Sequence, residues 1–179
     1  MIKAVIDTNI FVSGLLNTSG APAKLILRWF KAQFEVLISE QITEEYEYIL
    51  RHLDGVEQAK VDAILNEFNM SEVKVVIPCT LKVCKDPDDD KFLETAVVGQ
   101  ADYLVTKNTK HFPHKSYQGI RIVKISTFLK ELEKQFPNRW QTYCLPPYVS
   151  RITFYFLLFS PHQSTHTPPE SPPASAAPK

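Results

Sequence analysis

Short β-rich runs and longer helical patterns alternate along the chain up to residue 136. Apolar, β-branched runs that predict strands lie at residues 3–6, 34–39, 73–77, 103–106 and 121–125. Between them, apolar residues recur at helical spacing over residues 23–33, 40–53, 56–68, 90–99 and 127–136. Strands separated by helices in this way predict an α/β fold, with a parallel sheet of about five strands and helices on both faces.

The composition changes abruptly after residue 137. Residues 1–137 contain 5 of the 13 prolines and all 5 glycines, whereas residues 138–179 contain the other 8 prolines and no glycine. We therefore expect one domain at 1–137, an aromatic and apolar extension at 138–159, and a Pro/Ser-rich disordered tail at 160–179. The extension could dock on the domain, bind a partner or be a non-native addition, and its pattern does not choose among these.

Charge, cysteines and hydropathy exclude several classes of protein. The 20 Lys and Arg residues balance the 20 Asp and Glu residues, and 3 cysteines without a C-x-x-C pair indicate neither a disulfide framework nor a zinc site. The longest apolar run, within residues 152–159, is far shorter than the roughly 20 residues of a membrane span. Because the N-terminus also lacks the features of a secretory signal, we expect a cytoplasmic protein without a membrane span.

Polar residues that follow the predicted strands are the first candidates for a site, because ligands of parallel sheets gather outside the carboxyl ends of the strands. Asp7 follows the first run and could cap the next helix, bind a metal, or do both. In the helix at 40–53, Glu45 borders the apolar stripe, whereas Glu44 lies almost opposite its centre. Glu45 could therefore face the site or reach solvent. Asn108 follows the fourth run and could coordinate a metal weakly.

Residues 85–91 read K-D-P-D-D-D-K, directly before a predicted helix. The acidic residues of this run are Asp86, Asp88, Asp89 and Asp90. A helix N-terminus favours acidic side chains, but capping requires only one or two of them. Carboxylates this close together repel one another unless a cation is present. A Mg²⁺ or Mn²⁺ ion would supply that charge, whereas a calcium hand is excluded because the required glycine is missing.

A basic stretch follows the acidic run. No acidic residue lies between Asp102 and Glu131, whereas this interval contains Lys107, Lys110, Lys115, Arg121 and Lys124. These side chains could bind the phosphates of an RNA, or they could be ordinary surface residues. His111 and His114 have no Cys or acidic partner at zinc spacing, so we interpret them as loop residues. The motifs of a nucleophile elbow, a phosphate loop and a dinucleotide-binding turn are absent from the sequence.

Four segments, in their order and spacing, resemble the PIN domain family. They are V-I-D-T-N-I at 5–10, S-E-Q-I-T-E-E-Y at 39–46, D-P-D-D-D-K-F-L at 86–93 and A-D-Y-L-V-T-K-N at 101–108. The resemblance covers residues 1 to about 136 and is closest to the VapC-like toxins of toxin–antitoxin systems. It implies a Rossmann-like sheet, an acidic cluster that binds Mg²⁺ or Mn²⁺, and endoribonuclease activity that hydrolyses RNA phosphodiester bonds.

The resemblance also implies roles for particular residues. Asp7 matches the first acidic position of the family and Glu45 the second. Asp90 matches the third, with Asp89 as a one-residue alternative, and Asp86 could join through water. The fourth position is usually an Asp within Thr-Gly-Asp, where this chain has Asn108.

The change at the fourth position has two opposite consequences for function. Loss of one charge could lower metal affinity, or the neighbouring Lys107 could contact phosphate instead.

The resemblance as a whole implies an RNA-cleaving toxin of a type II pair, held by an antitoxin protein and often forming a homodimer. The alternative is a catalytically weakened PIN-fold module that binds RNA or protein.

Overall fold

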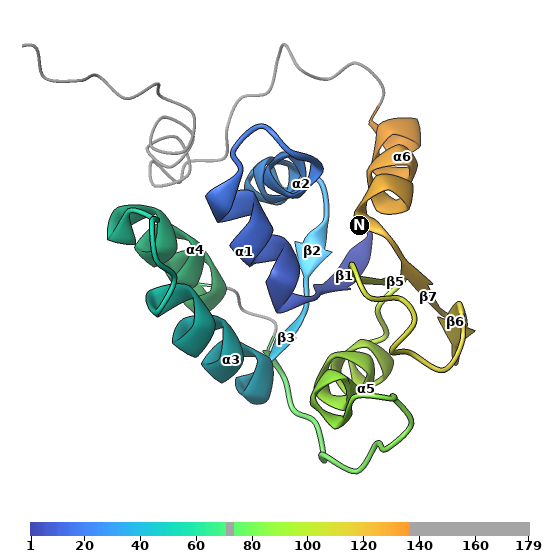
Figure 1. Cartoon of the computed structure of the whole chain (residues 1–179). Coiled ribbons are helices and arrows are strands. Elements are labelled where there is room, and N and C mark those ends of the chain that lie inside the picture. The colour runs from blue at the N-terminus through green and yellow to red at the C-terminus, as the bar shows by residue number, and fades with distance from the viewer. Residues whose placement is uncertain (71–73, 137–179) are drawn as a thin grey trace, which may run out of the picture.

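The computed structural model describes residues 1–70 and 74–136 (Figure 1). The predicted extension at 138–159 and the predicted tail at 160–179 lie outside the described residues. The central sheet has five strands in the order β2-β1-β5-β7-β6, and only β6 runs antiparallel to its neighbour. The strands are β1 (Lys3–Ile6), β2 (Glu35–Val36), β5 (Tyr103–Val105), β6 (Ser116–Tyr117) and β7 (Ile120–Val123). The predicted α/β class with a mostly parallel sheet is confirmed.

The composition of the sheet differs from the prediction in two places. The predicted strand at 34–39 divides into β2 and β3 (Ile38–Ser39), and β3 pairs in parallel with β4 (Lys74–Val75) as a separate two-stranded sheet. The short strand β6 was not predicted, because two residues of mixed polarity give no periodic signal. The sheet therefore has the predicted number of strands but not the predicted set.

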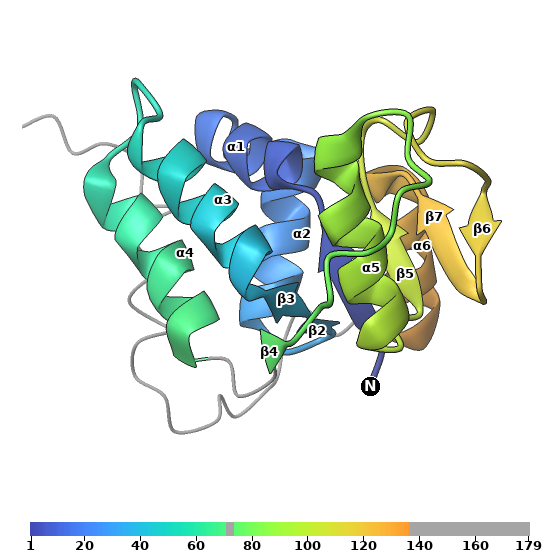
Figure 2. The same ribbon diagram turned by 90° about the horizontal axis from the view of Figure 1, so that it is seen from below.

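Six α-helices surround the strands of the described chain. They are α1 (Thr8–Leu16), α2 (Ala21–Phe30), α3 (Glu40–Arg51), α4 (Gln58–Met70), α5 (Asp90–Val98) and α6 (Ile125–Gln135), with a short 3₁₀ helix η1 (Pro87–Asp89) before α5. Helices α5 and α6 lie on opposite faces of the sheet, as expected (Figure 2). No single helix within residues 1–70 and 74–136 is long and apolar enough to cross a membrane. The bent pair α1 and α2, at 105° to each other, meets that test when taken together.

An aromatic cluster joins the first four helices. Phe11, Trp29, Tyr46 and Phe68 come from α1, α2, α3 and α4, and their ring centroids lie 4.7–5.7 Å apart in the pairs that touch. Large buried rings of this kind contribute much of the apolar area of a core. Because Tyr46 packs against Phe11, helix α3 is held against α1, which places the neighbouring Glu45 near the carboxyl end of β1.

Candidate metal and active site

Asp7 lies at the centre of the candidate site. It follows β1, is 3% exposed, and caps α1 by accepting a hydrogen bond from the Asn9 N–H to Oδ1 at 2.9 Å. Its second oxygen, Oδ2, accepts a hydrogen bond from Thr106 Oγ1 at 2.5 Å. The predicted capping role of Asp7 is confirmed, and its role as a metal ligand stays a prediction.

Thr106 reaches Asp7 because β1 and β5 are neighbouring parallel strands, with Ile6 paired to Val105. The Thr106 hydroxyl is fully buried and also accepts a hydrogen bond from the Asn108 backbone N–H at 2.9 Å. The Asn108 residue itself is exposed. The turn of the chain after β5 therefore holds the Thr106 hydroxyl where it donates to Asp7. The same turn places Asn108 at the surface, close to the carboxyl end of β5.

Glu45, rather than the exposed Glu44, turns toward the carboxyl end of β1. Its Oε1 accepts a hydrogen bond from the Thr8 hydroxyl, and its Oε2 forms an ion pair with Lys91 Nζ at 2.5 Å. The Glu45 side chain is 21% exposed, so it is neither buried without a partner nor free in solvent. Helical periodicity correctly distinguished Glu45 from the exposed Glu44, and the role of Glu45 as a metal ligand stays a prediction.

The pKa of the neighbouring Tyr46 is affected by the charges at this strand end. Its hydroxyl donates a hydrogen bond to the carbonyl oxygen of Ile6, the last residue of β1. Burial raises the pKa of Tyr46 well above its usual range, and the negative charges of Asp7 and Glu45 raise it further. The two carboxylates therefore act on the same buried point, although they are 38 positions apart in the sequence.

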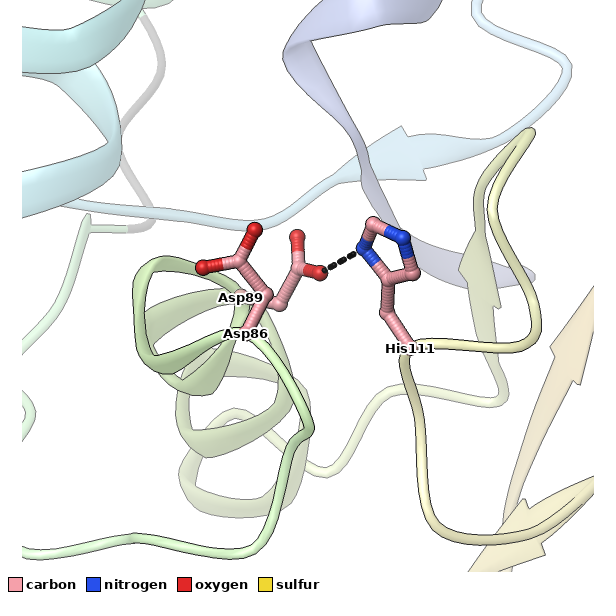
Figure 3. A group of neighbouring side chains, drawn as sticks. All are labelled: Asp86, Asp89 and His111. Carbon is pink, nitrogen blue, oxygen red and sulfur yellow. Dashed lines mark hydrogen bonds and ion pairs between the residues drawn. The ribbon is translucent and has the colours of Figure 1, made fainter.

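A second group of side chains lies at the start of α5. Asp86 and Asp89 offer carboxylate oxygens, and His111 offers a ring nitrogen, all within 4.8 Å of one another (Figure 3). His111 reaches over from the loop after β5, and its Nδ1 is 2.8 Å from Asp89 Oδ2. Burial raises the pKa of Asp89, the hydrogen bond from His111 opposes this, and the charges of Asp7 and Asp86 raise it again. Asp89 is thus electrostatically coupled to Asp7.

Asp90 has a different environment from Asp89. Its Oδ1 accepts hydrogen bonds from the backbone N–H groups of Cys84 at 2.8 Å and Val83 at 3.0 Å. Burial raises the pKa of Asp90, but these N–H groups, the Cys84 thiol and the charge of Lys82 together outweigh it and hold the pKa of the carboxyl below its usual range. One oxygen of Asp90 therefore anchors the loop before η1, whereas Asp89 faces the other acids. A metal-binding role for Asp90 stays a prediction.

The residues brought together have the chemistry of a divalent-cation site. Asp86 and Asp89 contribute carboxylates and His111 contributes an imidazole nitrogen within 4.8 Å of one another, and Asp7 lies close enough for its charge to raise the pKa of Asp89. Glu45 contacts Thr8, the residue next to Asp7. Carboxylate oxygens suit Mg²⁺ and Mn²⁺, and the like charges around Asp89 are the kind of repulsion that such an ion relieves. The donor set therefore fits a divalent cation, and the identity of that cation as Mg²⁺ or Mn²⁺ stays a prediction.

The predicted RNA-binding lysines lie outside this group of acids. Lys107, Lys110 and Lys115 are all exposed, in the segment between β5 and β6. The ammonium group of Lys107 donates a hydrogen bond to the Ser13 hydroxyl on α1, which places it beside the same strand end as Asp7. Their contact with RNA stays a prediction.

Sequence reasoning missed Lys91 and His111 as members of the site. Each contacts an acid that is distant in the sequence, Glu45 for Lys91 and Asp89 for His111. His111 was interpreted as a loop residue without an acidic partner; it does lie in a loop, but the fold supplies the partner from 22 residues away. No spacing rule could have found either contact, because both depend on how separate elements pack.

Fold and site together define a mixed α/β protein with a group of acidic residues near the carboxyl ends of its central strands. A family model described as PIN domain matches residues 3–110, and the chain belongs to the PIN domain family. The chain is also 28% identical over 145 residues to "Uncharacterized protein MJ1680" of Methanocaldococcus jannaschii, covering 74% of this chain and 93% of that protein. PIN domains are generally nucleases and typically use divalent metals.

Proposed function

We propose that this protein is a Mg²⁺- or Mn²⁺-dependent endoribonuclease that hydrolyses RNA phosphodiester bonds. The observation that carries the proposal is the convergence of acids from three separate parts of the chain. Asp7 lies at the end of β1, Glu45 on α3 and Asp89 at the start of α5, and their charges are coupled through Tyr46 and Asp89. Like charges brought this close favour the binding of a cation, and metal-assisted hydrolysis is the chemistry that such a site then supports.

The residues of the chain divide the work of this reaction. Asp7, Glu45 and Asp89 would hold the metal, which supplies a bound water of lowered pKa and neutralises charge on the leaving oxygen. Thr106 and Thr8 orient two of these ligands by donating hydrogen bonds to Asp7 and Glu45. Oriented ligands of this kind raise metal affinity and fix the geometry of the site.

Other residues would bind the substrate and complete the set of ligands. His111 holds the Asp89 carboxylate at 2.8 Å, and Asp86 lies close enough to join the metal directly or through water. The exposed Lys107, Lys110 and Lys115 would bind phosphates of the RNA backbone. Asp90 remains in the proposal as a supporting acid, since its Oδ1 anchors the loop that leads into η1.

A cleavage assay with and without EDTA tests the proposed function. Wild type should cleave single-stranded RNA only with Mg²⁺ or Mn²⁺, and Asp7→Asn and Asp89→Asn should each lower the rate by at least about 100-fold, since each removes a ligand charge. Asp88→Asn is the matched control, because Asp88 belongs to the same acidic run but lies outside the group of Asp86, Asp89 and His111. Cleavage that persists in EDTA, or that is equal in wild type and Asp7→Asn, would contradict the proposal.

A catalytically weakened binding module is the second candidate, and Asn108 is the observation that favours it. An amide replaces the fourth acid of the family at an exposed position after β5. Asn108→Asp restores the charge and separates the two candidates. If wild type is inactive and Asn108→Asp gains metal-dependent cleavage, the site of the wild type is disabled. If wild type is active and Asn108→Asp is no more active, the amide is tolerated.

We propose further that the ribonuclease is the toxin of a type II pair and acts on cytoplasmic RNA. The support is the resemblance of its four acidic segments to the toxin branch of the family. Induced expression of wild type should stop bacterial growth, and Asp7→Asn should not. Coexpression of the reading frame next to the gene should restore growth if that frame encodes an antitoxin. Light scattering of the purified protein tests for the homodimer that is common in that branch.

A further inference from the structure

One lysine forms an ion pair with an acid of the candidate site. Lys91, in the first turn of α5, forms an ion pair with Glu45 of α3 at 2.5 Å, and the two side chains are only 24% and 21% exposed. Both oxygens of Glu45 are engaged, since the Thr8 hydroxyl donates to Oε1 and Lys91 occupies Oε2. A divalent cation that uses Glu45 as a ligand must therefore share it with an ammonium group or displace that group.

The position of Lys91 is unfavourable for the helix that carries it. A positive charge in the first turn of a helix opposes the helix dipole. Within residues 1–70 and 74–136, no other Lys or Arg forms an ion pair with Asp7, Glu45, Asp86 or Asp89. Glu45 is therefore the favourable partner of the Lys91 ammonium group.

The side chain of Lys91 is suited to a reversible contact. Lysine has a compact, strongly hydrated ammonium group on a flexible four-carbon stem, so it can leave one carboxylate without a change in the backbone. Lys91 is partly exposed, which gives the released ammonium group access to water. Arginine, with its rigid planar group, would hold a carboxylate through two parallel hydrogen bonds.

We propose that Lys91 is a built-in counter-ion of the acid cluster. Its ammonium group holds the Glu45 carboxylate in the absence of metal and competes with the divalent cation for that carboxylate. The inference rests on the proposed function, because it takes the cluster of Asp7, Glu45 and Asp89 to be the metal site. Lys91 thereby raises the concentration of metal at which the site is half occupied. Loss of its charge should strengthen metal binding, whereas loss of a merely structural ion pair would leave metal binding unchanged or weaken it.

Calorimetric titration of the RNA-free protein with Mn²⁺ tests this role directly. Lys91→Gln should bind Mn²⁺ about tenfold more tightly than wild type at low salt, because a unit positive charge no longer repels the ion at short range. Lys91→Arg keeps the charge and should bind Mn²⁺ no more tightly than wild type. Lys60→Gln is the matched control, since Lys60 also forms a partly buried ion pair, with Glu57 at 3.0 Å, at the start of α4.

Thermal unfolding gives a second measurement that does not depend on catalysis. In EDTA, Lys91→Gln should unfold at a lower temperature than wild type, because the acids then lack their cation. Mn²⁺ should raise the Tm of Lys91→Gln by more than it raises that of wild type. A Lys91→Gln protein that is unfolded in EDTA and folds in Mn²⁺ supports the inference, and one that stays unfolded in both overturns it.

The outcomes separate this inference from the proposed function. If wild type binds Mn²⁺ and Asp7→Asn does not, the metal site stands. Equal or weaker binding by Lys91→Gln than by wild type then overturns the role of Lys91 alone. If wild type shows no saturable Mn²⁺ binding, both the proposed function and this inference fail.

Discussion

The hydrogen bond between Thr106 and Asp7 offers a sensitive test of how the site is held. Thr106→Val replaces the hydroxyl by a methyl group of similar size at a fully buried position, so the packing of β5 is preserved. The change removes the 2.5 Å hydrogen bond to an Asp7 carboxylate that is only 3% exposed. Hydrogen bonds to charged groups contribute about 1.5–3 kcal/mol, so we expect the free energy of unfolding to fall by about 2 kcal/mol.

The same substitution should weaken metal binding. A hydrogen bond that orients a ligand typically contributes about 10–100-fold to metal affinity, so the Kd for Mn²⁺ should rise by that factor. The loss of stability should lower the Tm by roughly 4–8 °C for a domain of this size. Thr95→Val is the matched control: Thr95 is also fully buried, and its hydroxyl contacts the Lys91 backbone carbonyl oxygen at 2.7 Å and the Ser39 hydroxyl at 3.0 Å, rather than a carboxylate.

Calorimetric titration with Mn²⁺ and thermal unfolding in EDTA measure the two effects separately. Thr95→Val should lose stability and keep the affinity of wild type for Mn²⁺. Thr106→Val should lose both. An unchanged Mn²⁺ affinity in Thr106→Val, with the Tm lowered as expected, would refute the reasoning that Thr106 orients Asp7 for the metal.

The remaining predictions concern the loop before η1 and the basic stretch. Asp90→Ala should lower the free energy of unfolding by about 2 kcal/mol, because two backbone N–H groups lose a charged acceptor, whereas Asp88→Ala should have little effect. Because the pKa of Asp90 is lowered in the folded state, its contribution to stability is present above the ordinary pKa of about 4. That contribution is lost as the pH falls through the pKa of Asp90 in the folded state. Chemical denaturation of wild type and Asp90→Ala from pH 7 to pH 3 measures the loss. A difference in the free energy of unfolding between wild type and Asp90→Ala that stays constant from pH 7 to pH 3 would contradict this role of the Asp90 carboxylate. Replacing Lys107 and Lys110 together by Ala should weaken RNA binding and reduce the slope of log K against log salt by about 1.4, as filter binding at several salt concentrations would show. An unchanged slope would exclude phosphate contacts by these two residues.

Much of the fold was legible in the sequence because its signals are local. Apolar runs and helical periodicity depend on neighbouring residues, so they predicted the α/β class, most of the strands and five of the helices. Asp7 was found because it directly follows β1 and caps α1. Glu45 was distinguished from Glu44 because a rotation of 100° per residue separates the buried side of a helix from its exposed side.

Only the tertiary structure decided which neighbouring acid faces the others and which cation lies among them. Asp89 and Asp90 are adjacent and chemically identical, yet one faces His111 and the other holds the loop at Cys84, because successive residues at a helix start point in different directions. The contact of Lys91 with Glu45 depends on how α3 packs beside α5. The sequence by itself determined which charged groups exist and where the elements begin. Their pairing was decided by packing, since side chains from distant segments become neighbours only when the core between them has formed.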